Sequence, residues 1–554
     1  VFGNVDVTVP GAIVNIVNKK LDTDKVCVSD EFGNIVVSTI TVDELKSLSG
    51  VITNLQEQID AIKEFQNGVN GSAYNYYCDG TITFDDSTTG TGYVFSNRGI
   101  FKIENATKLI IYNGYITNAT AIYDTGLISV FLYDCDVKVE TPTSFSTFFK
   151  DCTVLKEINL SGLDFTNING LGDSFSNCRS LEKIEFHKPL FHQNANFWDF
   201  FNLCSSLKEL SIEYAVMGVY ANAFRRFCEC CSGLESVYLN SFSKESAELK
   251  TNLFSYGFTR GFDRCTNMTK FYCNNLGMGT IKKIKPDGAN YYIYNSNELA
   301  HIGSIDYMFC ECFKLKNIEI LNTPLGQGAI SYTVDGVYFE SSPFSTSMSH
   351  AFTGDTELEY VIIGEIPSDS LKENKKSVIR SAGRVFSFDY CFNECHALTD
   401  ISLYFDGGIV LSSTNNLFKG LFQNCTALKN IYIYMYNIEY TESSSRQLIS
   451  LSTTVLPEVS SFTLELGPFI LSGDSSQFRK VDLDLSCLSG WVNEASIYSF
   501  LETLPVLITD ARGTTAKFST LTISYATDIS IKNSSSCTAR KNVLYQGGWN
   551  FVVV

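Results

Sequence analysis

Cysteine is the residue type whose number and spacing in this 554-residue chain most invite a chemical role. Three of the 18 cysteines stand together as Cys228, Cys230 and Cys231, and clustered thiolates can bind zinc. A structural zinc site usually needs four ligands, often from two Cys-x-x-Cys pairs, and no second pair with matching spacing is present. We therefore expect no metal and no cofactor.

The other residue types used in catalysis form no known arrangement. The five histidines make no His-Glu-x-x-His pair, and no Gly-x-Ser-x-Gly elbow or phosphate-binding loop occurs. The 60 acidic residues will form carboxylate pairs by chance, and sequence gives no separation that singles out a pair for glycoside hydrolysis. We nominate no catalytic residue and expect that the chain is not an enzyme.

Tyrosines offer binding chemistry instead, because their flat apolar rings and hydroxyl groups suit sugar rings or a protein partner. Several lie in short segments of alternating apolar residues, where every second side chain points away from the core. The candidate ligand-binding residues are Tyr238, Tyr272, Tyr404, Tyr432, Tyr434 and Tyr436. The same row would also suit aromatic packing under an inserted loop or in a trimer contact.

These segments belong to an internal repeat that begins at residue 149 and runs aromatic-x-x-Cys-x-x-Leu-x-x-Ile-x-Leu. The positions of its cysteine are Cys152, Cys178, Cys204, Cys231, Cys265, Cys312, Asp355, Cys395 and Cys425. They are 26 to 47 residues apart, so the longer steps imply inserted loops, the longest between the fifth and eighth units. Because Asp355 still fits the pattern, we expect free structural thiols rather than a ladder of disulfides.

The two halves of the repeat predict different local structures. Its Ile-x-Leu end has the period of a half-buried strand, and its first half has a period of three, which suits a turn. One unit cannot bury its apolar residues alone, but stacked units can. The repeat therefore predicts a solenoid with parallel strands on one face.

The unit resembles the BspA-like, or treponemal, class of leucine-rich repeat. The shared core is an asparagine or glutamate before the cysteine, as in Asn177-Cys178, Glu311-Cys312, Glu394-Cys395 and Asn424-Cys425. This resemblance covers residues 145–435 and implies a protein of bacterial surfaces, of some protists or of phage particles. The closing segment, with a helix at 497–504 and strands at 520–524 and 551–554, is similar to the cap of such repeat domains.

A heptad pattern precedes the repeat. Its apolar positions, spaced alternately by three and four residues, are Leu45, Leu48, Ile52, Leu55, Ile59 and Ile62. This spacing is that of a coiled coil, although a helix packed on its own domain would show it too. Upstream, alternating valines around a turn at residues 29–34 predict a small hairpin.

The hairpin and the heptads together resemble the stem of bacteriophage tail and head fibres. The order Glu44-Leu45, Leu48-Ser49-Gly50-Val51 and then a glutamine-containing heptad carries this resemblance over residues 10–65. It implies a helix that trimerises, residues that attach to other virion proteins, and a virion location.

Composition limits the remaining partners. The net charge of −18 disfavours nucleic acid, and no apolar run is long enough to cross a membrane, so no membrane insertion is expected.

The expected fold is mainly β with short helices: a leucine-rich-repeat solenoid after a short trimeric coiled coil and a small β segment. The expected parts are an attachment segment, a trimerisation helix, a β-rich lead-in, the solenoid and a cap, at residues 1–40, 41–68, 69–144, 145–490 and 491–554.

These features point to adhesion. We expect a trimeric phage tail or head fibre that binds a glycan or protein of the host surface. The alternatives are a leucine-rich adhesin on a bacterial cell surface and a purely architectural part of a virion.

The heptads predict the mass of the chain in solution. Light scattering on the full chain should give three times 61.7 kDa, about 185 kDa, because the apolar seams bury one another in a trimer. Deleting residues 41–68 should abolish this mass. A monomer near 61.7 kDa would show instead that the heptad helix packs on its own chain.

Overall fold

The computed structural model describes Lys25–Ser29, Ile35–Thr41 and most of residues 75–554. Within residues 75–554, the longest stretches that it leaves undescribed are 134–142, 187–196, 295–303, 365–373, 472–480 and 505–518. The chain divides into two compact units, Val1–Tyr74 and Asn75–Val554. The described residues are mainly β with parallel sheets, as the sequence predicts.

The described part of Val1–Tyr74 is the predicted hairpin. Strand β1 (Lys25–Ser29) pairs antiparallel with β2 (Ile35–Thr41), and Cys27 lies opposite Val37. The predicted trimerisation residues lie outside the described residues; they are Leu45, Leu48, Ile52, Leu55, Ile59 and Ile62.

The unit Asn75–Val554 opens with an eight-stranded sheet. Its strands are β3 (Tyr76–Phe84), β4 (Thr89–Val94), β5 (Gly99–Glu104), β6 (Lys108–Tyr112), β7 (Tyr115–Ala121), β8 (Ser129–Tyr133), β10 (Glu157–Asn159) and β12 (Lys183–Glu185). Strand β3 pairs antiparallel with β4, β5 and β6, whereas β6, β8, β10 and β12 pair in parallel. The first two repeat units, which supply β10 and β12, therefore extend the sheet of the lead-in.

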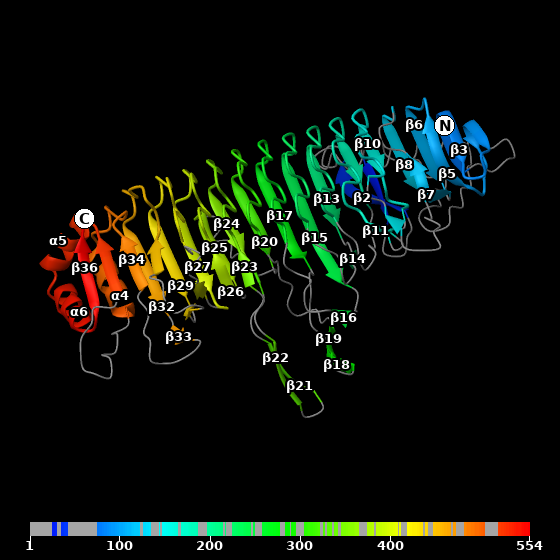
Figure 1. Cartoon of the computed structure of the whole chain (residues 1–554). Helices are drawn as coiled ribbons and strands as arrows, with labels where there is room; N and C mark the ends of the chain where they lie inside the picture. Colours follow the sequence, from blue (N-terminus) through cyan, green and yellow to red (C-terminus); the bar gives the residue numbers. More distant parts are fainter. Residues whose placement is uncertain are drawn as a thin grey trace. The chain divides into compact units, whose positions relative to one another are not determined.

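The later units place their Ile-x-Leu segments side by side in a second parallel sheet (Figure 1). In order, its strands are β13 (Glu209–Glu213), β15 (Ser236–Lys244), β17 (Lys270–Leu276), β20 (Asn317–Leu321), β24 (Tyr360–Ile363), β25 (Lys376–Ser381), β27 (Asp400–Phe405), β29 (Asn430–Met435) and β32 (Ser461–Leu466), with β14 (Val216–Met217) also paired to β15. Strand β25 comes from the insertion between the seventh and eighth units, where the sequence predicts only a loop.

Other inserted segments also form strands. A shorter parallel sheet consists of β23 (Ser345–Ser347), β26 (Arg384–Ser387), β28 (Ile409–Leu411), β30 (Ile438–Tyr440) and β33 (Phe469–Leu471). Two hairpins fill the longest insertions: β18 (Lys283–Asp287) with β19 (Asn290–Tyr294), and β21 (Ile330–Val334) with β22 (Val337–Ser341). Short pairs link β16 (Glu248–Leu249) to β19, and β9 (Thr143–Ser144) to β11 (Ile168–Gly170).

The C-terminal segment combines a sheet with three helices of the described residues. The sheet order is β31 (Gln447–Ser450), β34 (Val481–Leu485), β35 (Ser519–Ile523) and β36 (Trp549–Val553). Helix α4 (Glu494–Thr503) matches the predicted helix, but α5 (Tyr525–Asn533) and α6 (Ser535–Gln546) were not predicted. The buried residues of α6 include Cys537 and Leu544, and such a sparse apolar pattern gives a weak helical signal.

Each repeat turn contains two residues in the left-handed conformation, one and five residues before the cysteine position. These residues, all with positive φ, are Thr147, Asp151, Asp173, Asn177, Asp199, Leu203, Arg226, Cys230, Arg260, Arg264, Tyr307, Glu311, His350, Gly354, Tyr390, Glu394, Gly420 and Asn424. This conformation lets the turn donate hydrogen bonds sideways: Phe175 N donates to Phe200 O at 3.0 Å, and Asn177 N donates to Asn202 O at 2.7 Å. The turns therefore pair between units as the strands do.

The cysteine of each unit connects the turns from inside. Its thiol donates to the carbonyl of the aromatic position one unit earlier, at 2.8 to 3.2 Å. The donors are Cys178, Cys204, Cys231, Cys265, Cys312, Cys395 and Cys425. The cysteines that the structure describes are free thiols, and nearly all are buried.

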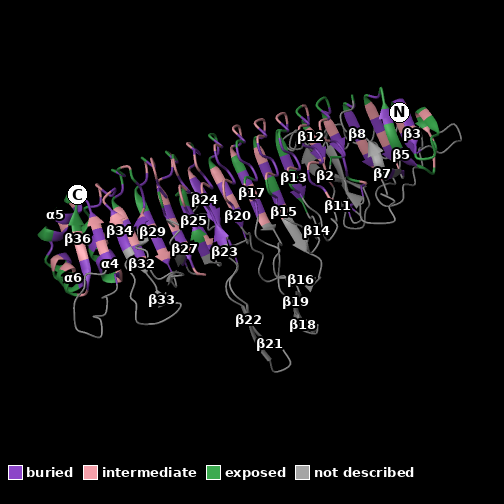
Figure 2. Cartoon of the chain, in the orientation of Figure 1, coloured by how far each residue is buried: buried purple, intermediate pink, exposed green. Residues whose placement is uncertain are grey.

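The interior is one apolar cluster that extends from Tyr76 to Trp549 (Figure 2). Phenylalanines of the aromatic position stack from unit to unit, with Phe309 and Phe352 centroids 5.8 Å apart. Where Cys228 takes the aromatic position, Phe227 contacts both Phe201 at 5.4 Å and Phe262 at 6.2 Å. The adjacent residue thus fills the gap in the stack.

Asp355 interrupts the thiol ladder. Its side chain is fully buried, its Oδ1 accepts from Cys312 N at 3.0 Å, and its Oδ2 has no hydrogen-bond partner. Burial raises the pKa of Asp355 well above its usual value. Nearby, burial raises the pKa of Asp263 to about 6, although Arg264 opposes the shift.

Replacing Asp355 with cysteine should stabilise the protein at neutral pH. Because the pKa of Asp355 is higher in the folded state, folding favours the neutral carboxyl group. The contribution of this group to folding stability is complete below about pH 4, and it is lost as the pH rises through the folded-state pKa. At pH 7 the Asp355→Cys variant should melt at a higher temperature, and its melting temperature should rise less than that of the wild type on acidification to pH 5. Thermal unfolding followed by circular dichroism measures both, with exposed Asp85→Asn as control. A lower melting temperature for Asp355→Cys at pH 7 would contradict the interpretation that the buried Asp355 carboxyl group destabilises the fold at neutral pH.

Candidate functional site

The outward side of the second sheet carries the predicted tyrosines in register. One row consists of Ser211, Tyr238, Tyr272, Glu319, Ile362, Val378, Ser402, Tyr432 and Thr463. The neighbouring row places Arg380, Tyr404, Tyr434 and Glu465 side by side. The structure thus brings the tyrosines together in two groups at separate places along the sheet.

The first group is a stacked pair on β15 and β17. The rings of Tyr238 and Tyr272 are nearly parallel, with an angle of 8° and centroids 4.8 Å apart. Asn240 Nδ2 donates to the Tyr238 hydroxyl at 3.3 Å, and Asn274 Nδ2 donates to Asn240 Oδ1 at 3.1 Å. Tyr272 is partly buried, and this burial raises the pKa of its hydroxyl group. Tyr238, in contrast, is 37% exposed. The pair therefore presents one accessible ring held by an amide network.

The middle of the row is not exposed as predicted. Ile362 is fully buried in a small cluster with Leu321 and Tyr360, and Tyr272 packs against this cluster. The Tyr360 hydroxyl donates to Glu319 Oε1 at 2.8 Å. In the first sheet Asn159, the middle residue of its Ile-x-Leu segment, is buried and donates to Glu185. Alternation gives the direction of these side chains, but neighbours decide their exposure.

The second group is packed against itself and against charged residues. Tyr404 lies 5.3 Å from Tyr432 and 6.5 Å from Tyr434, and the Arg380 guanidinium lies 4.7 Å from the Tyr404 ring. Arg380 also forms an ion pair with Asp406 at 2.9 Å. Burial raises the pKa of Tyr432, as does its hydrogen bond with Glu465.

Tyr436, the remaining candidate residue, lies outside the described residues.

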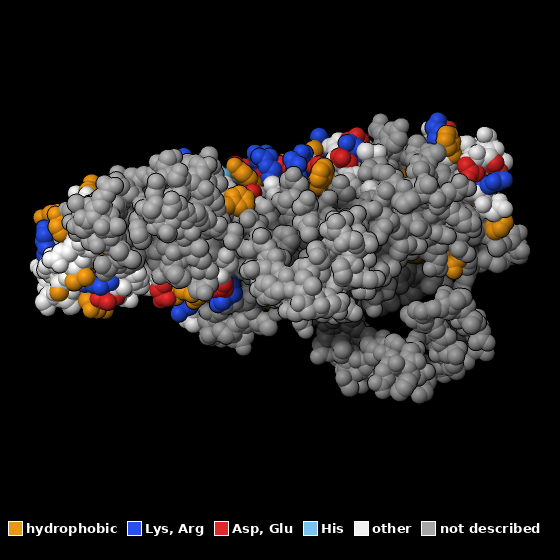
Figure 3. Space-filling model, turned by 60° about the horizontal axis from the view of Figure 1, so that its bottom comes forward, with side chains coloured by type: hydrophobic (Ala, Val, Ile, Leu, Met, Phe, Trp, Pro, Cys, Tyr) orange, Lys and Arg blue, Asp and Glu red, His pale blue; other side chains and the backbone are white. Residues whose placement is uncertain are grey.

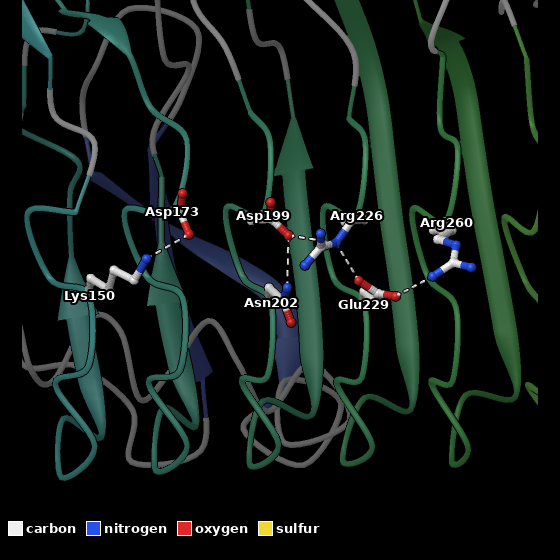
Figure 4. A network of polar contacts seen from close by, with 7 residues as sticks. All are labelled: Lys150, Asp173, Asp199, Asn202, Arg226, Glu229 and Arg260. Atoms are coloured by element: carbon white, nitrogen blue, oxygen red, sulfur yellow. Dashed lines mark hydrogen bonds and ion pairs between the residues drawn. The ribbon is translucent and has the colours of Figure 1, made fainter.

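The turn edge carries a network of ion pairs that sequence reasoning missed (Figure 4). Arg226 Nε lies 2.9 Å from Asp199 and 2.5 Å from Glu229, and Glu229 also faces Arg260 at 3.4 Å. Asp199, Arg226 and Arg260 stand at the same position of three successive turns, and Glu229 lies on the turn of Arg226. Their charges are already compensated, so the network links units and offers little free charge to a ligand.

An aromatic stack continues this edge. Arg260 lies 5.2 Å from Tyr307, which stacks on His350 at 4.7 Å, and His350 stacks on Tyr390 at 5.2 Å. Burial lowers the pKa of His350. Acidic and basic side chains are interspersed on the described surface (Figure 3). Because the rings cover one another, the stack presents edges rather than open faces.

The cysteine cluster is largely enclosed by the fold. Cys228 and Cys231 are buried within the ladder, and Cys230 is half-buried. Burial raises the pKa of Cys230, with Glu229 acting in the same direction. Among the residues that the structure describes, no group of three or more potential ligands could hold a metal ion.

Comparison of the sequence with models of known families gives no match, and comparison with curated proteins gives none. No helix in the described part of the chain is long and apolar enough to span a membrane. The stacked tyrosine pair on β15 and β17, in which Tyr238 is accessible, is the best-supported candidate site on structural grounds.

Truncating a side chain should cost little stability on the outward face of this sheet and much more on its inward face. Tyr238→Ala should cost at most about 1.5 kcal/mol, because the exposed ring contributes mainly one aromatic contact. Phe271→Ala, one residue before Tyr272 and buried against Phe262 and Phe309, should cost about 3–5 kcal/mol. Chemical denaturation checks the difference, with Tyr238→Phe as the conservative control. Equal losses would place Tyr238 in the core.

Proposed function

We propose that this chain is a trimeric bacteriophage tail or head fibre that binds the host cell surface. In this proposal residues 1–40 attach to other virion proteins, residues 41–68 form the trimeric coiled coil, and the repeats form a leucine-rich solenoid closed by residues 491–554. The ligand is a surface glycan or protein. Binding occurs on the outward face of the second sheet.

The pairing of the repeat units supports the solenoid. Strands of successive units pair in the second sheet, with β25 between those of the seventh and eighth units, and each turn donates to the next turn. Such a repetitive parallel sheet is compatible with stacked repeats that bury a continuous core between neighbours. The assignment to BspA-like repeats rests on the sequence motif.

The accessible tyrosine pair is the observation that carries the binding role. An aromatic side chain that the core does not need, held by asparagines and accessible at Tyr238, is the kind of group that dominates recognition surfaces. The charged turn edge, in contrast, is internally compensated. A ligand would therefore meet the sheet face more favourably than the turn edge.

Trimerisation would strengthen weak binding. The three identical sites of one trimer raise avidity by factors of about 10² to 10⁴ without any new contact, provided that they reach the host surface together. Strong adhesion would therefore depend on the heptad seam as well as on the binding surface. Trimerisation and ligand binding are two parts of the proposal that can be tested separately.

A cell-binding experiment tests the proposal. Fluorescently labelled full-length chain should bind a subset of a bacterial panel, and the double variant Ile52→Asp, Leu55→Asp should bind at least about tenfold more weakly, because it loses avidity. The matched control, Gln56→Asp with Gln58→Asp, places the same charges off the seam. Absence of binding to every strain would favour the purely architectural role.

A further inference from the structure

The two faces of the Tyr238 ring differ. Tyr272 covers one face, with centroids 4.8 Å apart. Toward the other face, the register places Ser211 of β13 directly beside Tyr238. A serine side chain is too small to cover a phenol ring, which agrees with the exposure of Tyr238. One aromatic face is thus open above a small polar residue.

Hydrogen-bonding groups border this open face. Glu209 and Glu213 flank Ser211 on the same side of β13, and all three are exposed. Because a strand rises about 3.3 Å per residue, the two glutamates stand about 13 Å apart along β13. Asn240, in register with Glu213, donates to the Tyr238 hydroxyl oxygen, so the hydroxyl proton can be donated to a ligand.

The charge of the border selects the ligand. Neither Glu209 nor Glu213 forms an ion pair within the part of the chain that the structure describes. Two carboxylates accept hydrogen bonds from hydroxyl or ammonium groups and repel other carboxylates. The border therefore favours neutral or amine-bearing ligands over acidic ones.

We propose that the open face of Tyr238 is a subsite for one neutral or amine-bearing sugar ring. The apolar face of the sugar stacks on the phenol, and its hydroxyl groups bond to Ser211, Glu213 and the Tyr238 hydroxyl. The ring and its polar border match the design of sugar and other small-molecule sites, which combine an apolar contact with a few placed polar groups. The subsite rests on the proposed adhesive function and specifies its ligand.

Two other aromatic groups of the repeat region lack this combination. Arg380 and two tyrosines surround the Tyr404 ring, and the Tyr307, His350 and Tyr390 rings cover one another. Tyr432 also lies beside a serine, Ser402, but the Tyr404 ring lies 5.3 Å from the Tyr432 ring. Tyr498 of α4, which is as exposed as Tyr238 but lies outside the sheet, is the control position.

An array that displays monosaccharides at high density tests the subsite with the full-length chain. Glucose, galactose, glucosamine and glucuronic acid serve as probes. At least one neutral or amine-bearing sugar should bind, and glucuronic acid should bind more weakly. Tyr238→Ala should weaken binding at least about tenfold, the factor that corresponds to loss of one good contact. Ser211→Tyr, which covers the open ring face, should do the same, whereas Tyr498→Ala should change binding less than twofold.

A gain of binding provides a second readout. The double variant Glu209→Gln, Glu213→Gln should bind glucuronic acid better than the wild type, a result that misfolding would not produce. Unchanged binding by Tyr238→Ala, stronger wild-type binding to glucuronic acid, or no binding to any probe would overturn the subsite. If the wild type still binds cells in those cases, only the subsite fails; if it binds no cell, adhesion itself fails.

Discussion

Lateral hydrogen bonding between equivalent turns is the constraint on which the repeat region depends. A turn that curves the chain between strands leaves backbone groups that neither helix nor strand satisfies. Two left-handed residues per unit turn these groups toward the neighbouring unit, where they are paired. The cysteine thiol then gives a second hydrogen bond to the carbonyl of the aromatic position, which already accepts from a backbone N–H of its own turn. Small side chains are therefore required at the cysteine position, because each turn stacks closely on the next.

The same constraint leaves much of the outward face of the second sheet free to vary. Inward positions are occupied by Leu, Ile and Phe, whose burial stabilises the stack. Outward positions vary from serine to tyrosine to glutamate without disturbing the register. Binding groups can accordingly accumulate there at little structural cost. The stacked tyrosine pair and the carboxylates of β13 are such a local accumulation.

Much of this organisation could be predicted from the sequence. The Ile-x-Leu segments and the aromatic and cysteine positions predicted the strands and the core, because their periods differ and recur. The left-handed residues could not be predicted, since Arg226, Arg260 and Tyr307 have no preference for that conformation. The burial of Ile362 and the position of β25 depend on neighbouring strands and insertions, which a local pattern does not contain. At the candidate site, Tyr238 was predicted, but its open face depends on Ser211 of another unit.

Asp355 divides the ladder into two runs of thiols. Each unit of the stack contacts only its neighbours, so cooperative unfolding spreads from one interface to the next. The weakest interface limits how far the unfolding spreads. The turn of the seventh unit carries a buried carboxyl group in place of a thiol donor. Under a pulling force the two runs should therefore behave as separate mechanical blocks, with rupture starting at this unit. A repeat chain built in this way loses order on one side of the seventh unit while the other side keeps its shape.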